Sequence, residues 1–296
     1  MDTAAVSLTF DVEDWFHPEL VRPHVAAVDP RSVVVPGTEA ILERLARHGV
    51  RATFFVVGDV VRSHPGLVRR IAAAGHEIAC HGMTHRPLWA LDPEGFRAEL
   101  RAFRSAVRAA LGHDPVAGFR APTFSLDRST AWALDVLRAE GFAYDSSVFP
   151  ARMRLYGGAG APRGIWRPAR GDLAAHDPHG NLVEFPVAVA EWAGFRLPVA
   201  GGFYLRALPG PLFRRALDGI LRQRPGALYL HPWECVPDVP RVRLGPIDAF
   251  ITYVNLGSVG RKLEALLERY RFAPMREILE SGGHLAAPAT ARRSTS

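Results

Sequence analysis

The stretch LTFDVEDWFH, residues 8–17, places three acidic residues, Asp11, Glu13 and Asp14, directly behind a short apolar run. The run is typical of a buried β-strand, and on an extended strand Asp11 and Glu13 point to one side while Asp14 points to the other. Carboxylates held this close repel one another unless a cation or a proton is present. The stretch therefore predicts a strand that ends in a functional site, the alternative being a solvated strand end at which Asp14 caps a turn.

Apolar runs of the same kind recur along the chain and alternate with segments of helical periodicity. Strands are predicted at 6–11, 52–57, 77–80, 116–119, 142–145, 182–187 and 227–231, and helices at 37–49, 65–75, 93–111, 128–141, 210–224 and around 263–270. This alternation is typical of an α/β fold with a largely parallel sheet. Seven strands with a crossover after each fit one barrel better than two separate domains.

The chain is expected to form a single domain over residues 1–283. Within it, the stretch 151–181 is rich in Gly, Pro and Arg and is predicted to be an irregular insertion, whereas the tail 284–296 is predicted to be disordered. No apolar run reaches the roughly 18 residues that a membrane span needs, and the N-terminus lacks the pattern of a secretion signal. We therefore expect no transmembrane segment and a cytoplasmic location.

The formal net charge of +6 comes almost wholly from arginine, since Lys262 is the only lysine. Proteins that bind nucleic acid concentrate basic residues on one helix or tail, whereas here the arginines are spread along the chain. No nucleic-acid partner is therefore expected. Two cysteines, Cys80 and Cys235, do not make a disulfide framework and are predicted to be small buried side chains.

A pair of histidines follows the third predicted strand, in GHEIACHGMTHRPL (75–88). His81 and His85 lie four residues apart, a spacing that presents two imidazoles on one face of a helical turn and suits a divalent metal. The alternative is a pair of surface histidines. Two histidines and one acid leave coordination positions open, which is typical of a catalytic metal site. His76 precedes the strand and is expected to lie outside the cluster.

Two further polar positions follow predicted strands, in GFRAPTFSLD (118–127) and FAYDSSVFP (142–150). Arg120 can hold a catalytic carboxylate in place and keep it ionised, with Pro122 fixing the backbone after it. Asp145 can pair with a base or with Arg120. The alternatives are a surface arginine and an ordinary turn or helix cap.

The last predicted strand ends in ALYLHPWE (227–234). His231 follows an apolar run and can serve as a general acid. Trp233 beside it can form a pocket wall or a surface on which a sugar stacks. The alternative is a histidine that is merely hydrogen-bonded in the core.

Taken together and in this order, the five stretches resemble the polysaccharide deacetylase family, carbohydrate esterase family four. In that family an Asp pair in the first strand is followed by H-x-x-x-H, R-x-P, an Asp-containing strand and a Leu-His segment. The matching residues are Asp11, Glu13 or Asp14, His81, His85, Arg120, Pro122, Asp145 and Leu230-His231, and they span residues 8 to 234. Many members read T-F-D-D-G where this chain reads T-F-D-V-E-D-W. Strand parity favours Glu13 as the second acid and leaves Asp14 as the alternative.

The resemblance implies a distorted (β/α)7 barrel and a divalent metal, with Zn²⁺ the expected ion. The implied roles are metal ligation by His81, His85 and Glu13 or Asp14; base catalysis by Asp11; orientation of that base by Arg120 and Asp145; and protonation of the leaving amine by His231. The backbone N–H of Thr123 is the implied oxyanion donor. The implied reaction is hydrolysis of an N-acetyl group, which releases acetate and a free amino sugar.

Several further stretches, among them VAGGFYLRALP (199–209), resemble deacetylases encoded with exopolysaccharide export systems, the exosortase-associated subgroup. This resemblance implies an N-acetylated sugar polymer or its lipid-linked precursor as substrate, and exopolysaccharide biosynthesis machinery as a partner. Two alternatives stay open. One is an amide hydrolase that acts on small ureido or purine-derived substrates, and the other is a carbohydrate-binding protein without catalytic activity.

Overall fold

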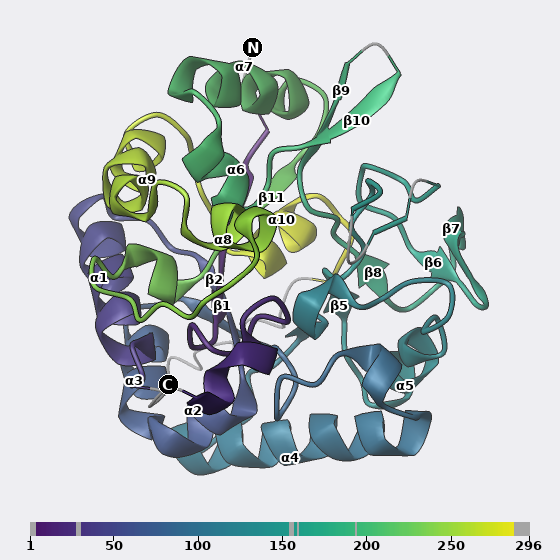
Figure 1. Ribbon diagram of the computed structural model, residues 1–296. Helices are drawn as coiled ribbons and strands as arrows, with labels where there is room; N and C mark the ends of the chain where they lie inside the picture. The colour runs from purple at the N-terminus through teal and green to yellow at the C-terminus, as the bar shows by residue number, and fades with distance from the viewer. Residues whose placement is uncertain (1–3, 28–30, 154–156, 159, 193, 287–296) are drawn as a thin grey trace, which may run out of the picture.

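The centre of the protein is a curled parallel sheet of seven strands, in the order β11-β1-β2-β3-β4-β5-β8 (Figure 1). The computed structural model describes residues 4–27, 31–153, 157–158, 160–192 and 194–286. The strands are β1 (Val6–Val12), β2 (Thr53–Val56), β3 (Glu77–Cys80), β4 (Gly118–Phe119), β5 (Tyr144–Asp145), β8 (Val183–Glu184) and β11 (Gly226–Leu230). All seven predicted strands are present, and most are shorter than the sequence pattern suggested.

The two edges of this sheet meet, so that the sheet closes into a distorted barrel. Val187, just after β8, forms a parallel bridge to Ala227 of β11, and the amide of Ala188 donates to the carbonyl of Ala227 over 2.9 Å. The structure therefore confirms the predicted α/β fold, a distorted (β/α)7 barrel in a single domain.

Ten α-helices are described, and most of them surround the barrel (Figure 1). They are α1 (Val34–Arg47), α2 (Gly58–Ser63), α3 (Pro65–Ala73), α4 (Pro93–Leu111), α5 (Ala133–Ala139), α6 (Gly202–Ala207), α7 (Gly210–Leu221), α8 (Pro246–Tyr253), α9 (Val259–Leu267) and α10 (Met275–Ser281). Short 3₁₀ turns are η1 (Arg22–Ala27), η2 (Leu88–Ala90), η3 (Pro122–Phe124), η4 (Pro232–Cys235) and η5 (Leu256–Ser258). The predicted helix at 93–111 matches α4, which begins behind an Asp92 cap that accepts from the Gly95 amide over 2.7 Å.

Alternate residues of each strand serve two different cores, because successive side chains point to opposite faces. Leu8, Phe10 and Val12 of β1 point outward and belong to the large core shared with the helices. Phe55 and Tyr144 point inward and pack with Met275 and other residues of α10. The Met275 amide also donates to Thr53 Oγ1, so α10 closes the amino end of the barrel and leaves the carboxyl end for a site.

Two small antiparallel pairs extend from the barrel. The stretch 151–181, expected to be irregular, contains β6 (Pro168–Ala169) and β7 (Asp172–His176), and its residues 154–156 and 159 lie outside the described residues. A second hairpin joins β9 (Val189–Trp192) to β10 (Phe195–Pro198). Most of the tail predicted to be disordered, residues 287–296, also lies outside the described residues. Within the part of the chain that is described, no helix is long and apolar enough to cross a membrane.

Candidate metal and acid–base site

A pocket opens at the carboxyl end of the barrel, where the strand ends place most of the predicted site residues. Asp11 lies near the end of β1, and Glu13, His81 and His231 follow β1, β3 and β11 directly. All four line a cavity of about 150 Å³, together with Thr123 and residues of α6 and α8. The carboxyl end of the strands is where active sites form in parallel α/β barrels.

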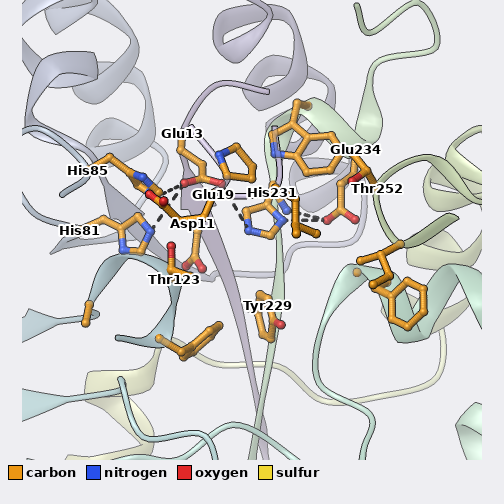
Figure 2. Close-up of a pocket in the computed structure, with 18 of the residues that line it drawn as sticks. Asp11, Glu13, Glu19, His81, His85, Thr123, Tyr229, His231, Glu234 and Thr252 are labelled. Carbon is orange, nitrogen blue, oxygen red and sulfur yellow. Dashed lines mark hydrogen bonds and ion pairs between the residues drawn. The ribbon is translucent and has the colours of Figure 1, made fainter. Parts of the chain in front are cut away.

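Three side chains converge at one side of this pocket in a geometry that suits a metal ion (Figure 2). One ligand atom each from Glu13, His81 and His85 lies within 4.8 Å of the others, and all three residues are buried. Glu13 Oε2 contacts His85 Nε2 and lies 3.9 Å from His81 Nε2. His85 has a positive φ of 55°, a conformation that turns its ring back toward Glu13. Among the described residues, no other group of this kind is found.

Hydrogen bonding determines which ring nitrogen of His81 faces the pocket. His81 Nδ1 lies 2.9 Å from the carbonyl oxygen of Arg120, which can only accept, so Nδ1 must carry the proton. The lone pair on Nε2 then points toward Glu13. Burial, more than the neighbouring charges, lowers the pKa of His81 to about 4, so its ring is neutral at neutral pH. A neutral imidazole with a fixed tautomer is the form that binds a metal.

The Glu13 carboxylate is ionised and aimed at these rings. Burial alone would raise the pKa of Glu13, but the adjacent His85, and then His231 and His81, hold it well below its usual range. Two imidazole lone pairs and one carboxylate oxygen are the donor set of a catalytic zinc site with open positions. The residues present therefore fit a divalent cation.

Asp14, the alternative ligand, turns away from the pocket. Its Oδ1 accepts the Trp15 amide over 3.1 Å and the Val33 amide over 2.9 Å, so Asp14 fixes the turn after β1 against the start of α1. This geometry places Glu13, and not Asp14, with the two histidines, in the way that strand parity predicts.

Asp11 is held by Arg120 in the middle of the barrel. Arg120 Nη1 donates to Asp11 Oδ1 over 2.7 Å and to Thr9 Oγ1 over 2.7 Å, and both charged side chains are buried. The guanidinium lies over the ring of Phe55, 4.1 Å from its centroid. Because Arg120 is fixed by several contacts, the orientation of the Asp11 carboxylate is fixed as well.

The expected contact between Asp145 and Arg120 is not formed among the described residues. Arg120 Nε and Nη2 donate instead to Ser146, at its carbonyl oxygen over 3.1 Å and at its Oγ over 3.0 Å. Asp145 points the other way, accepts from Ser147 Oγ over 2.5 Å and lies against the carboxyl group of Glu184. Burial raises the pKa of both carboxyl groups, and the charge of Asp145 raises that of Glu184 further, so the pair holds a shared proton. The sequence did not indicate Glu184, because it lies far along the chain from Asp145, although β8 pairs with β5 in the sheet.

His231 faces Glu13 from the opposite side of the pocket, with its Nε2 3.6 Å from Glu13 Oε1. Its Nδ1 lies 3.1 Å from Glu234 Oε2, which also accepts the His231 amide over 2.9 Å. Burial acts to lower the pKa of His231, but the hydrogen bond to Glu234 and the charge of Glu13 outweigh it and raise the pKa to about 9. His231 is therefore protonated at neutral pH and can donate a proton into the pocket.

Trp233, Pro122 and Thr123 occupy three different positions. The ring of Trp233 stacks on His231, with centroids 5.5 Å apart, and is only 5% exposed, so it supports His231 more than it offers an open surface. Pro122 is buried beside Gly82 and is not among the residues that line the pocket. Thr123 lines the pocket and lies below Asp11 in Figure 2. Its φ of 58° is in the left-handed region.

Three residues of the site were not assigned a role from the sequence. Glu234 binds His231, and Arg206 Nε donates to Glu234 Oε1 over 3.0 Å. His17 stacks on His85 with ring centroids 5.2 Å apart, and its Nδ1 accepts the Asp14 amide over 3.0 Å. A sequence signal existed for Glu234, since an acid three residues after His231 matches the spacing of a capping box. For Arg206 and His17 the sequence contains no such signal.

The barrel thus ends in a Glu–His–His cluster with an arginine-bound aspartate and a protonated histidine beside it, an arrangement that can hold a divalent cation next to a base and an acid. Residues 1–142 match the model of the polysaccharide deacetylase family. Residues 146–280 match a separate family that is described only as a domain of unknown function, DUF3473.

Curated relatives match a limited part of the chain. A chitooligosaccharide deacetylase from Rhizobium leguminosarum bv. trifolii is 44% identical over 100 residues, which are 34% of this chain and 43% of the relative. A peptidoglycan-N-acetylglucosamine deacetylase, PgdA, from Listeria monocytogenes is 33% identical over 102 residues, which are 34% of this chain and 21% of the relative. The matched region thus spans less than half the length of either relative.

Solved structures share the fold over nearly the whole chain. A protein from Mycobacterium smegmatis that is assigned to the polysaccharide deacetylases superposes with a TM-score of 0.64 and 24% identity, covering 98% of this chain and 94% of that chain. A mutant of a CE4-family pseudoenzyme from Bacillus anthracis superposes with a TM-score of 0.51 and 15% identity, covering 94% of this chain and 68% of that chain. Both similarities establish the barrel fold. The reaction has to be inferred from the residues of the site.

Proposed function

We propose that the protein is a metal-dependent hydrolase that removes the acetyl group from an N-acetylated sugar of a glycan. The observation that carries the proposal is the convergence of Glu13, His81 and His85 within 4.8 Å, in a pocket that Asp11 and His231 also line. A binding protein has no need of a fixed carboxylate and a protonated histidine around one metal-ligand set. Hydrolysis of an amide needs both, because one group takes a proton from water and the other gives one to the leaving nitrogen.

Each residue then has a role that follows from its contacts. A divalent cation held by Glu13, His81 and His85, with Zn²⁺ the ion this donor set favours, would polarise the acetyl carbonyl and a water molecule. Asp11 takes the proton from the attacking water through Oδ2, since Arg120 occupies its Oδ1. The backbone N–H of Thr123 stabilises the oxyanion.

His231 completes the reaction from the far side of the pocket. Its Nδ1 proton is bound by Glu234, and the proton on Nε2, the nitrogen that faces Glu13 in the pocket, passes to the nitrogen of the breaking C–N bond. The products are acetate and a free amine on the sugar. Asp145 does not line the pocket, and it accepts from Ser147 Oγ, which in turn accepts the amide of Ala121 over 2.7 Å.

The size of the pocket favours a substrate of which only one substituent enters the pocket. Its volume of about 150 Å³ is below the roughly 300–1,000 Å³ of sites that enclose a whole small molecule. An acetamido group fits such a space while the rest of the glycan lies outside. The names of the relatives support N-acetylglucosamine as the acetylated sugar. An exopolysaccharide or its lipid-linked precursor as substrate, biosynthesis machinery as partner and a cytoplasmic location stay predictions from the sequence.

The test is acetate release by purified protein after removal and return of the metal. We expect acetate and free amine in equal amounts from N-acetylglucosamine oligomers, loss of both after chelation, and recovery with zinc. Small ureido and purine-derived amides are assayed in parallel. Ring opening of these amides without acetate release would support the small-amide hydrolase instead. Glycan binding without turnover by the metal-loaded protein would show a binding protein and overturn the proposal.

A further inference from the structure

The β9–β10 hairpin carries its apolar side chains on one face, and most of these side chains are exposed. Antiparallel pairing sets Trp192 opposite Phe195 and Ala190 opposite Leu197, and residues directly opposite each other share a face. On this face Trp192 is 72% exposed, Phe195 71% and Leu197 46%. The hairpin projects from one edge of the molecule beside α7 (Figure 1).

The other face of the hairpin is charged and holds it to the body of the protein. Glu191 and Arg196 are the opposed pair on this face. Arg196 Nη1 donates to the carbonyl oxygens of Pro150 and Ala161 over 2.9 and 2.8 Å, and Glu191 lies 2.5 Å from Arg163. A hairpin on a globular protein normally buries its apolar face and exposes its polar one. Here the order is reversed, so the exposed apolar face needs an explanation of its own.

A groove of about 730 Å³ separates this apolar face from α7. Trp192 and Leu197 line one wall, while Ile220 and the half-exposed Leu212 of α7 line the other. This surface lies apart from the pocket at the carboxyl end of the barrel, since the two share no lining residue.

The groove is rimmed by positive charge. Arg163, Arg215 and Arg224 line it against a single acid, Glu191. Arg224 is anchored by bonds from Nε to the carbonyl of Arg163 over 2.9 Å and from Nη2 to that of Val189 over 2.7 Å. Exposed aromatic and aliphatic side chains next to arginines are complementary to a partner that has an apolar interior and an anionic surface.

We propose that the apolar face of β9–β10 and the adjoining turn of α7 dock on an anionic lipid bilayer. Trp192, Phe195 and Leu212 enter the interfacial region, where aromatic side chains concentrate, and the arginines contact lipid phosphates. A glycan fits this surface less well, because the exposed Leu197 and Leu212 offer a sugar neither a stacking face nor a hydrogen bond, whereas they add to the apolar area that can enter a bilayer. The proposal concerns binding to the membrane and does not depend on the proposed reaction.

The experiment is flotation of the full chain with vesicles of phosphatidylcholine, with and without phosphatidylglycerol. We expect binding only to the anionic vesicles and weakening by salt. Trp192→Ala with Phe195→Ala should lower the partition coefficient at least about tenfold, since two large apolar side chains no longer enter the bilayer. Arg215→Glu should lower it severalfold on anionic vesicles.

Matched variants on other parts of the surface distinguish binding by this surface from non-specific binding to vesicles. Trp89→Ala removes another exposed tryptophan, on η2, and Arg108→Glu reverses a charge on α4, at the opposite edge of the molecule in Figure 1. Both should bind vesicles like the unaltered protein. All variants should keep native near-UV circular dichroism, which excludes misfolding as the cause.

Three outcomes would overturn the proposal. The unaltered protein could fail to float with anionic vesicles, or the Trp192/Phe195 variant could float as well as the unaltered protein. In the third, sedimentation shows a dimer that the double variant dissociates while vesicle binding is absent, which would assign the surface to a second copy of the chain.

Discussion

The two halves of the chain contribute different parts of the pocket. The first 142 residues provide Glu13, His81 and His85 together with the Asp11–Arg120 pair, and they are the part that matches the polysaccharide deacetylase family. The second half, from residue 146, provides His231 and the wall formed by α6 and α8. The groups proposed to activate water thus lie in the half that matches the polysaccharide deacetylase family, and the proposed acid lies in the half that matches DUF3473.

The two halves also hold their groups in different ways. Glu13, His81 and Arg120 follow strands of one sheet directly and are fixed by barrel geometry. His231 follows β11 as well, but its partner Glu234 is held by Arg206, which also donates to the carbonyls of Ile251 and Val254 over 3.0 and 2.7 Å. Movement of α8 would therefore be transmitted to His231 through Arg206 and Glu234. Substitutions in the two halves should affect activity in separable ways.

The largest effect is expected from Glu13→Gln in the first half. Loss of the only charged ligand should remove bound metal and lower acetate release by roughly 10³-fold or more, since a neutral amide is a poor ligand for zinc. Asp14→Ala is the matched comparison. It should keep the metal and lower the free energy of unfolding by about 1–3 kcal/mol, because the buried amides of Trp15 and Val33 lose their acceptor.

Metal analysis by mass spectrometry and urea unfolding of both variants decide between the two acids. Retention of metal by the Glu13 variant, with loss from the Asp14 variant, would contradict the assignment of Glu13. His113→Ala, at an exposed histidine, provides the control for nonspecific metal binding.

A smaller effect is expected from His231→Ala in the second half. Turnover should fall by about 10²–10⁴-fold, the usual contribution of a general acid, while the metal content stays that of the unaltered protein. Glu234→Gln should lower kcat less, because it weakens the support of His231 without removing the proton donor. Glu264→Gln breaks another His–Glu pair, with His48 on the surface, and should leave kcat unchanged. Loss of metal from the His231 variant would show that substitutions in the two halves do not affect turnover and metal binding separately.

Most of the fold could be predicted because parallel strands buried on both faces form recognisable apolar runs. The barrel's closing contacts could not, since α10 and the bridge from Val187 to Ala227 depend on residues far apart in sequence. The hairpin β9–β10 was also missed. Its alternation of apolar and charged residues matches a strand, but only the structure shows that the charged face is the inner one.

The site was predictable to the extent that it lies at strand ends. Asp11, Glu13, His81 and His231 meet because parallel strands bring their carboxyl ends to one edge. The supporting contacts were not predictable, since Arg206 and Glu184 lie far along the chain from their partners Glu234 and Asp145. Asp145 shows the limit most clearly. Its place in the sequence suggested a partnership with Arg120, while the next residue, Ser146, makes that contact.

The smallest effect is expected at the junction of the two halves, where Glu184 of β8 lies against Asp145 of β5. Burial and the charge of Asp145 raise the pKa of Glu184, so the folded protein holds a proton that the unfolded chain releases above its ordinary pKa. At pH values above the ordinary pKa of a glutamate, folding is therefore accompanied by the uptake of a proton. The free energy of unfolding should for this reason fall as the pH increases. The contribution is at most about 1.4 kcal/mol per pH unit for one proton.

Glu184→Gln should remove this dependence while keeping the site intact. The glutamine amide can donate to an ionised Asp145, so no proton has to be taken up on folding. Urea unfolding between mildly acidic and mildly alkaline pH should give a flatter stability profile for the variant, with metal content and kcat retained. Glu39→Gln, in a surface pair with Arg70, serves as the control and should keep the slope of the unaltered protein. An unchanged slope in the Glu184 variant would mean that the two carboxyl groups hold no shared proton, and that the junction is stabilised by packing alone.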